Sequence, residues 1–283
     1  MQPLIQKLPL TEGRSFIART FETPLFETPF HQHNEVELVL CRGSNGTAFI
    51  GDYINEYEFG EIYLLGKNLP HWFRKKEKEM IGRALVIQFN EDMFGSGTLA
   101  LPELDSIKEL LKNARKGIKL KGELHTKVKK ELNTIEEKTG FGQLMSLLDC
   151  LHAISISGEY DYLNKSYFLD SSKDVQNKIG TVLEYTMNHY TQKIKLEEVA
   201  QLINQSIPRF CKYFKTNTKK TYVQFLNEVR INHACKLIKT SNRNITDICY
   251  ESGFRNWANF SVQFKRICNM TPTQYRNKHL GIN

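Results

Sequence analysis

The chain has 283 residues, of which 40% are hydrophobic and 25% charged, a composition typical of a folded protein rather than a disordered one. Its length exceeds the ~100–200 residues of an ordinary domain, so we expect two domains. No apolar run approaches the ~20 residues of a membrane-spanning helix. Residues 1–14 also lack a signal-peptide pattern. We therefore expect a cytoplasmic protein with no membrane partner.

Six cysteines are scattered along the chain without any CxxC pair. This pattern predicts reduced, buried thiols and no structural zinc site.

The charge is unevenly distributed along the sequence. Residues 171–283 contain 18 Lys and Arg against 7 Asp and Glu, whereas the preceding 170 residues contain 21 against 24. The whole basic excess therefore lies in the last part of the chain, and a polyanion such as nucleic acid is its expected partner. A basic surface that serves only solubility is the alternative.

The region from about residue 15 to 95 has the pattern of short strands. Val36, Leu38 and Leu40 alternate along one segment, and the apolar runs 62–65 and 84–87 follow glycine-containing turns. Strands punctuated in this way predict a sandwich or a barrel.

Helical periodicity begins after Pro102. Three apolar stripes mark three helices, and the third, Gln143–Ile156, is our choice for a homodimer contact, with a purely intramolecular bundle as the alternative. The segment Asp161–Lys173 has the composition of a linker. From Val175 onward the pattern is helical nearly throughout.

An internal repeat dominates the last hundred residues. Phe210, Phe214 and Lys215 recur fifty positions later as Phe260, Phe264 and Lys265. The matches continue in the segments 221–225 and 271–275, and 196–200 recurs as 245–249. Two copies of one supersecondary unit are therefore present.

Each copy has the parts of a helix-turn-helix motif. A short apolar helix precedes a polar turn, with Ser206 or Asn256 as the expected N-cap of a second helix. That second helix buries its phenylalanine pair and leaves polar residues outward, the arrangement that enters a DNA major groove. The helix predicted between the copies, Tyr222–Lys239, spans roughly 27 Å, close to the ~34 Å of one DNA turn.

The run Val229–Ile238, Ile245–Cys249, Gly253-Phe254 and Thr271–Arg276 closely resembles the AraC/XylS family of transcription regulators over residues 175–280. This resemblance implies an α+β multidomain protein. It comprises an N-terminal cupin-like β-barrel (1–100), a helical linker or dimerisation region (101–170) and an all-α double helix-turn-helix domain (171–283). Lys219 and Asn269 stand where the family usually has glycine, and the left-handed conformation costs Lys about 1 kcal/mol.

The resemblance also implies which side chains meet DNA. The positions expected to face bases are Pro208, Arg209, Cys211, Lys212, Trp257, Ala258, Asn259 and Val262. The positions expected to meet phosphates are Lys215, Arg255, Lys265, Arg266 and Arg276. Arg and Lys can donate to guanine, and Asn can pair bidentately with adenine. For each lysine, a solvated surface charge is the alternative.

The N-terminal half contains a second group of polar residues. His31, His33 and Glu37 are similar to the first metal-ligand motif of cupins, and in a strand all three would face the same side. The partner motif should place a histidine at position 63, where the chain has Tyr63, and His71 comes later. We therefore expect these five residues to form an effector pocket, with neither metal nor cofactor, because the ligand set is incomplete.

Together, these features predict a ligand-responsive, DNA-binding transcription regulator, not an enzyme. Its expected partners are double-stranded promoter DNA, RNA polymerase, a small-molecule effector and a second copy of the chain. Two alternatives remain at this stage. One is a metal-dependent cupin enzyme or metal sensor tethered to a DNA-binding module, and the other is a constitutive DNA-binding protein whose barrel only dimerises.

Overall fold

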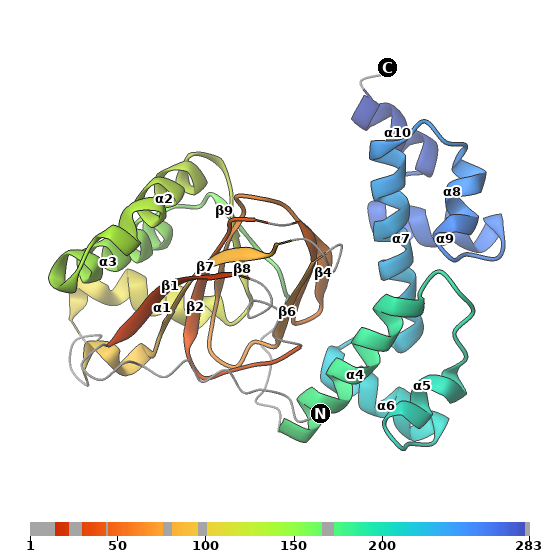
Figure 1. Cartoon of the computed structure of the whole chain (residues 1–283), viewed down its shortest axis with the longest axis horizontal. Helices are drawn as coiled ribbons and strands as arrows, with labels where there is room; N and C mark the ends of the chain where they lie inside the picture. The colour runs from red at the N-terminus through yellow and green to blue at the C-terminus, as the bar shows by residue number, and fades with distance from the viewer. Residues whose placement is uncertain are drawn as a thin grey trace. The chain divides into compact units, whose positions relative to one another are not determined.

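The computed structural model describes residues 15–22, 30–43, 45–75, 81–95, 101–165 and 173–280. The chain divides into two compact units, Met1–Gln176 and Asn177–Asn283 (Figure 1). The predicted boundaries at residues 100 and 170 both fall outside the described residues and stay predictions.

The first unit is built on two antiparallel sheets. Its strands are β1 (Phe16–Glu22), β2 (Val36–Cys41), β3 (Gly46–Ile50), β4 (Tyr53–Tyr57), β5 (Ile62–Leu65), β6 (His71–Lys75), β7 (Arg83–Phe89), β8 (Ile118–Leu120) and β9 (Tyr160–Tyr162). One sheet has the order β1-β7-β2-β5-β8-β9 and the other the order β4-β3-β6. A shared apolar cluster joins them, with Val39 and Tyr63 from the first sheet and Ala48 and Phe73 from the second. The strands predicted between residues 15 and 95 are thus confirmed as a two-sheet barrel.

Every residue of β2 is buried, because both faces of this strand are covered. Leu38 and Leu40 face the helices, whereas Val39 and Cys41 face the other sheet. Glu37 lies on the same side of the strand as Val39 and is only 6% exposed. The strand therefore carries a carboxylate into the interior of the barrel.

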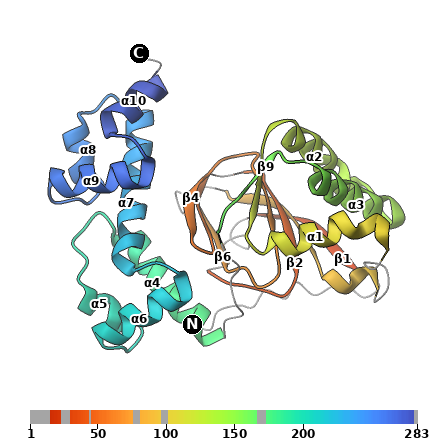
Figure 2. The same cartoon turned by 180° about the vertical axis from the view of Figure 1, so that it is seen from behind.

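Three helices cover the outer face of the larger sheet (Figures 1 and 2). They are α1 (Asp105–Ala114), α2 (Gly122–Thr134) and α3 (Gly140–Ile156), with the short turns η1 (Glu91–Phe94), η3 (Pro102–Leu104) and η4 (Ile135–Glu137). Leu147 and Leu151 of α3 are fully buried in the core that these helices share with the sheet. Much of the apolar stripe predicted to contact a second chain therefore packs within this unit.

The segment predicted as a linker is in part structured. Its first residues belong to β9, which pairs with β8. Beyond the strand, the Asn164 side chain accepts a hydrogen bond from the Asp52 amide at 2.7 Å and donates to the Lys116 carbonyl at 2.8 Å. The chain is thus held against the barrel as far as residue 164, and the rest of the predicted linker, residues 166–172, lies outside the described set.

The second unit consists of helices. They are α4 (Lys173–His189), α5 (Leu196–Leu202), α6 (Ile207–Thr218), α7 (Tyr222–Thr240), α8 (Ile245–Glu251), α9 (Trp257–Cys268) and α10 (Pro272–Leu280). The long helix α7 contacts α6 of the first repeat and α8, α9 and α10 of the second (Figure 2). Across the described ranges, no helix combines the length and the apolar character that a membrane crossing requires.

The six cysteines are all free thiols. Cys41, Cys150 and Cys249 are buried as predicted, but Cys211 is exposed because it lies on the outer face of α6. The Sγ atoms of Cys235 and Cys268 lie 3.4 Å apart.

Candidate nucleic-acid interface and histidine cluster

The first helix-turn-helix motif consists of α5 and α6. Asn204, with φ 53°, makes the turn between them in a left-handed conformation that Asn adopts at small cost. Phe210 and Phe214 are fully buried, and both rings contact Tyr222 of α7 at centroid distances of 5.4 and 5.5 Å. Ser206 holds the N-cap position as predicted, but its side chain makes no capping hydrogen bond among the described residues. The aromatic cluster therefore fixes α6 against α7.

The second motif, formed by α8 and α9, repeats this arrangement. Gly253 makes the turn with φ +90° and is packed so closely that an added Cβ would lie 2.4 Å from the Tyr190 carbonyl oxygen. The Asn256 side chain caps α9 by accepting a hydrogen bond from the Asn259 amide at 2.8 Å, as predicted. Phe260 and Phe264 are fully buried. Both motifs thus present a second helix that is fixed by its aromatic face.

Each second helix ends in a residue with positive φ. Lys219 follows α6 with φ 61° and Asn269 follows α9 with φ 56°, as the departure from glycine at these two positions predicted. The Lys219 amide donates to the Lys215 carbonyl at 3.0 Å, which closes the helix end.

The structure leaves the whole predicted base-facing set exposed. The set consists of Pro208, Arg209, Cys211 and Lys212 on α6 and Trp257, Ala258, Asn259 and Val262 on α9. These residues all lie in the first two turns of their helices. Trp257 and Val262 of this set are 41% and 63% exposed. Each motif therefore presents polar and apolar side chains to solvent along the first two turns of its second helix.

Four of the five predicted phosphate contacts, Lys215, Arg255, Lys265 and Arg266, are also exposed. Arg276 differs, because it is half-buried and donates to the Arg243 carbonyl at 2.6 Å. This bond ties α10 to the segment before α8, so Arg276 has a structural role that its sequence position did not reveal.

Arg230 is a further residue that the sequence analysis did not single out. Its guanidinium donates to the carbonyls of Tyr190, at 2.8 Å, and Gln192, at 2.9 Å. It also lies 5.8 Å from the centre of the Phe254 ring. Arg230 of α7 thus joins the end of α4 to the turn of the second motif. In the sequence, the only indication of this role was that Arg230 lies in the segment 229–238, which resembles the AraC/XylS family.

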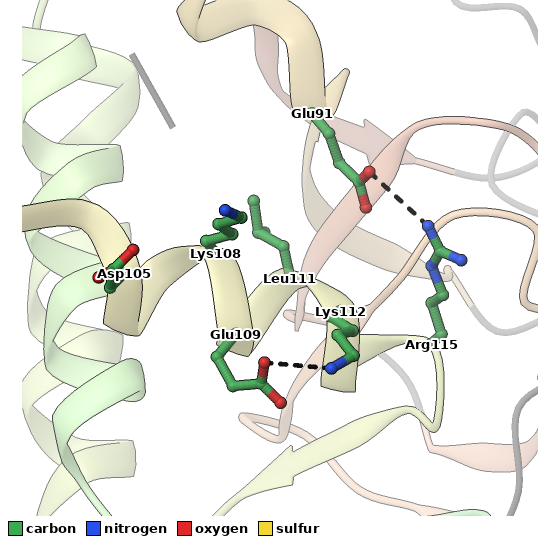
Figure 3. A pocket seen from close by; sticks show the side chains of 7 residues that line it. All are labelled: Glu91, Asp105, Lys108, Glu109, Leu111, Lys112 and Arg115. Carbon is green, nitrogen blue, oxygen red and sulfur yellow. Dashed lines mark hydrogen bonds and ion pairs between the residues drawn. The ribbon is translucent and has the colours of Figure 1, made fainter. Parts of the chain in front are cut away.

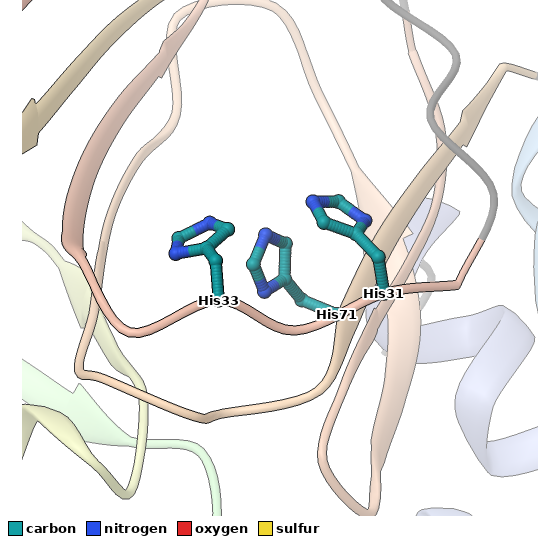
Figure 4. A group of neighbouring side chains, drawn as sticks. All are labelled: His31, His33 and His71. Atoms are coloured by element: carbon teal, nitrogen blue, oxygen red, sulfur yellow. The ribbon is translucent and has the colours of Figure 1, made fainter. Parts of the chain in front are cut away.

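A cluster of three histidines lies in the barrel (Figure 4). His31 and His71 exchange backbone hydrogen bonds of 3.0 and 2.8 Å, and their ring centroids lie 4.3 Å apart. The ring centroid of His33 lies 5.0 Å from that of His71. One nitrogen from each ring comes within 4.8 Å of the other two. The sequence predicted these three residues as pocket candidates, and the structure brings them together.

A buried carboxylate completes the cluster. Glu37 Oε2 lies 3.0 Å from His33 Nε2, and Glu37 Oε1 lies 3.8 Å from His71 Nε2. Gln88 of β7, which the sequence analysis missed, donates to Glu37 at 2.5 Å. Gln88 gave no signal because strand β7 is adjacent to β2 only in the folded sheet.

The pKa values of His33, Glu37 and His71 are shifted in different directions within the cluster. Burial lowers the pKa of His33, but the hydrogen bond and charge of Glu37 outweigh it and raise that pKa above 6.5. Burial would raise the pKa of Glu37, yet the histidines bring it to about 2. Burial lowers the pKa of His71 to about 4. The shifts thus favour the charged forms of His33 and Glu37, which lie 3.0 Å apart, and the neutral form of His71.

Tyr63, the fifth pocket candidate, is engaged elsewhere. Its hydroxyl donates to Glu61 at 2.5 Å, and its ring packs against Phe73. Within the sheet Tyr63 pairs with Val39, two positions along β2 from Glu37. His71 thus joins His31 and His33 where sequence spacing had pointed to position 63.

A separate surface hollow of about 650 Å³ lies beside α1 (Figure 3). It is lined by Glu91, Asp105, Lys108, Glu109, Leu111, Lys112 and Arg115. Several of these charges are already paired, with 3.8 Å between Arg115 and Glu91 and 3.4 Å between Lys112 and Glu109. The hollow contains none of the predicted pocket residues.

Comparison with known proteins agrees with the geometry of the second unit. Residues 199–278 match the family model of a helix-turn-helix domain. An uncharacterized HTH-type transcriptional regulator, YdeC of Bacillus subtilis, is 22% identical over 88% of this chain and 86% of its own length. A Staphylococcus aureus HTH-type regulator is 30% identical over 115 residues, but only 15% of its length is covered. The solved structure of ToxT from Vibrio cholerae is 18% identical, with 94% of this chain and 99% of that chain covered and a TM-score of 0.37.

The paired motifs and the matched domain define a DNA-binding protein with two helix-turn-helix units. The chain is a helix-turn-helix transcription regulator. Its C-terminal domain is of the AraC type, so the family assignment made from the sequence signature is confirmed for the part of the chain that carries the signature.

Proposed function

We propose that this regulator reads promoter DNA with α6 and α9 together and responds to an effector bound at the histidine cluster of the barrel. The observation that carries the proposal is the exposure of the eight base-facing candidates on these two helices. Helix α7 lies between the motifs and is 19 residues long, or about 28 Å. This length is close to the ~34 Å of one DNA turn, so both helices can enter successive major grooves.

The side chains of the two helices have different expected roles. Arg209 and Lys212 on α6 can donate to guanine, whereas Asn259 on α9 can pair bidentately with adenine. Trp257 and Val262 supply apolar surface suited to thymine methyl groups. The exposed lysines and arginines farther along α6 and α9 support phosphate contacts, which fix the register without reading sequence.

Binding of duplex DNA by matched variants of the full chain tests these roles. Asn259→Ala should weaken binding to the preferred site by about 1–3 kcal/mol and relax the preference at one base pair. Lys265→Ala should weaken binding to duplexes of every sequence by the same amount. It should also reduce the slope of log affinity against log salt concentration by about 1. Lys127→Ala, which removes one exposed charge from the other unit, is the control. Equal effects of Asn259→Ala on all sequences would contradict base reading by α9.

The effector acts through the barrel in this proposal. Its support is the buried Glu37, which the cluster surrounds with polar groups. An effector changes transcription only if it binds the DNA-competent arrangement with a different affinity from the incompetent one. Contact with RNA polymerase is the mode of activation that the family resemblance suggests.

A homodimer is the remaining part of the proposal. Phe141 and Met145 lie four residues apart on α3 and are 74% and 38% exposed, and Ile156 at the end of α3 is 65% exposed. Such an apolar surface favours a contact with a second copy. Sedimentation should show a dimer for the wild type and a monomer for Phe141→Asp. An unchanged dimer in that variant would exclude α3 from the interface.

A further inference from the structure

Two cysteine thiols of the second unit are in contact across helices α7 and α9. Their Sγ atoms lie 3.4 Å apart, although 33 positions separate the two residues in the chain. Cys235 lies on α7, and Cys268 is the last residue of α9. Both side chains are half-buried and pack against the apolar core that contains Phe260 and Phe264. The pair is therefore held together by the fold and is still partly open to solvent.

The surroundings favour ionisation of one thiol of this pair. The hydrogen bond with Cys235 lowers the pKa of Cys268; burial opposes this effect, and the positive charge of Lys239 adds to it. The same hydrogen bond and burial raise the pKa of Cys235. Because the thiolate is the form that reacts with oxidants, Cys268 is the expected nucleophile and Cys235 the thiol that resolves the product.

The other four cysteines differ from this pair in their exposure. Cys41, Cys150 and Cys249 are buried. Burial raises the pKa of Cys150 to about 12 and that of Cys249 to about 11, which makes these thiols poor nucleophiles. Cys211 is exposed, but it lies on α6 of the first motif.

We propose that Cys235 and Cys268 form a redox-sensitive site, at which a peroxide generates a reversible disulfide between α7 and α9. The Cys268 thiolate attacks one oxygen of hydrogen peroxide, so that an S–O bond forms, the O–O bond breaks and the leaving hydroxide takes up a proton to become water. The Cys235 sulfur then attacks the sulfenic acid sulfur. An S–S bond forms, the S–O bond breaks, and the hydroxyl leaves with the Cys235 proton as a second water. The two thiols lose two electrons in total, and the peroxide gains them.

The disulfide would change the position of the second reading helix. Bonded sulfurs are ~2.0 Å apart, so the two Sγ atoms must approach each other by about 1.4 Å. Side-chain rotation supplies part of this movement, and the remainder draws the end of α9 toward α7. Since α9 carries Trp257, Asn259 and Val262, its shift also moves the predicted base-facing surface. The effect on DNA rests on the proposed function, whereas formation of the disulfide does not.

Treatment of the reduced full chain with hydrogen peroxide, followed by alkylation of the remaining thiols and peptide mapping by mass spectrometry, tests the site. The expected product keeps four of the six thiols free and links Cys235 to Cys268, and dithiothreitol reverses the link. Cys235→Ser should leave Cys268 as a sulfenic acid, which dimedone traps. Cys249→Ala, which removes a buried thiol of the same unit, should form the same disulfide as the wild type.

Melting of the same proteins provides a second measurement. Peroxide should raise the melting temperature of the second unit by several degrees in the wild type and in Cys249→Ala, because the disulfide restricts the unfolded chain, but not in Cys268→Ser. A wild type that keeps all six thiols free, or that links other cysteines equally often, would overturn the proposal. Equal dimedone labelling of Cys268 and the exposed Cys211 in Cys235→Ser would overturn the role of Cys268 as the nucleophile.

DNA binding by the reduced and the oxidised protein separates this proposal from the proposed function. Oxidation should weaken binding to the preferred duplex severalfold in the wild type and in Cys249→Ala, but not in Cys268→Ser, which retains the exposed Cys211. Disulfide formation in a protein that binds no DNA would refute the proposed reading of DNA and leave the redox site intact. Reading of DNA by a protein that forms no disulfide would refute the redox site alone. An affinity that the disulfide leaves unchanged would refute its effect on α9.

Discussion

Gly253 is the position where the geometry of the second motif is most constrained, and Gly253→Ala should destabilise the C-terminal unit strongly. Its φ of +90° is strained for any L-residue, and this strain costs about 1–2 kcal/mol. The new Cβ would lie 2.4 Å from the Tyr190 carbonyl oxygen and 2.8 Å from Thr191 Cα, both backbone atoms. Such overpacking costs typically about 1–3 kcal/mol. The expected loss of unfolding free energy is therefore about 2–5 kcal/mol.

Urea denaturation of the full chain, followed by far-ultraviolet circular dichroism, measures this loss. The change should appear in the transition of the helical unit, since Gly253 lies in that unit. Gly158→Ala is the matched control, because no atom lies within 4 Å of its added Cβ. A Gly253→Ala protein within about 0.5 kcal/mol of the wild type, the range of an ordinary surface substitution, would refute the packing argument.

Three further substitutions test local features by the same denaturation. Lys219→Gly should raise the unfolding free energy by about 1 kcal/mol or less, because it relieves the left-handed φ of 61°. Asn256→Ala should lower it by about 1 kcal/mol through loss of the α9 cap. Burial raises the pKa of Glu136, but hydrogen bonds from Thr20 and Arg42 outweigh it and lower that pKa. The stability contributed by Glu136 is therefore complete above about pH 4.5 and lost as pH falls through the lowered pKa. Glu136→Gln should thus destabilise the barrel unit at pH 7 and have less effect at pH 3; equal effects at both would contradict the assignment.

The helical unit was predictable from sequence because its signals are local. The phenylalanine pairs at helical spacing, the turn residues and the caps all act within a few positions of each other. Lys219 and Asn269 even retain the left-handed conformation that the usual glycine would have had. Repetition of the pattern after fifty residues then removed the ambiguity of each single motif.

The histidine cluster was predictable only in part, because its neighbours come from different strands. The segment with His31 and His33 was visible, but the expected partner at position 63 pairs two steps along the sheet from Glu37. His71 joins the cluster because a β-bridge pairs His31 with the first residue of β6. Gln88 joins it because β7 pairs with β2. Contacts of this kind depend on strand order, which no local pattern specifies.

The apolar stripes of the first helices were ambiguous for a related reason, and the dimer contact on α3 stays a prediction. Their number suggested surface for a second chain, but the larger sheet has an outer face that needs covering. Leu147 and Leu151 of α3 pack against that face and are buried, whereas Phe141, Met145 and Ile156 of α3 are exposed to solvent.

The proposed function depends on simultaneous reading of DNA by α6 and α9. Its most direct test is selection of bound duplexes from a random library with the full-length protein, repeated at two salt concentrations. Reading by both helices should give an enriched site with two short blocks about 10–10.5 base pairs apart, one of which loses its base preference in Asn259→Ala. A single enriched block that Asn259→Ala leaves unchanged, or salt-sensitive binding without enrichment, would contradict it.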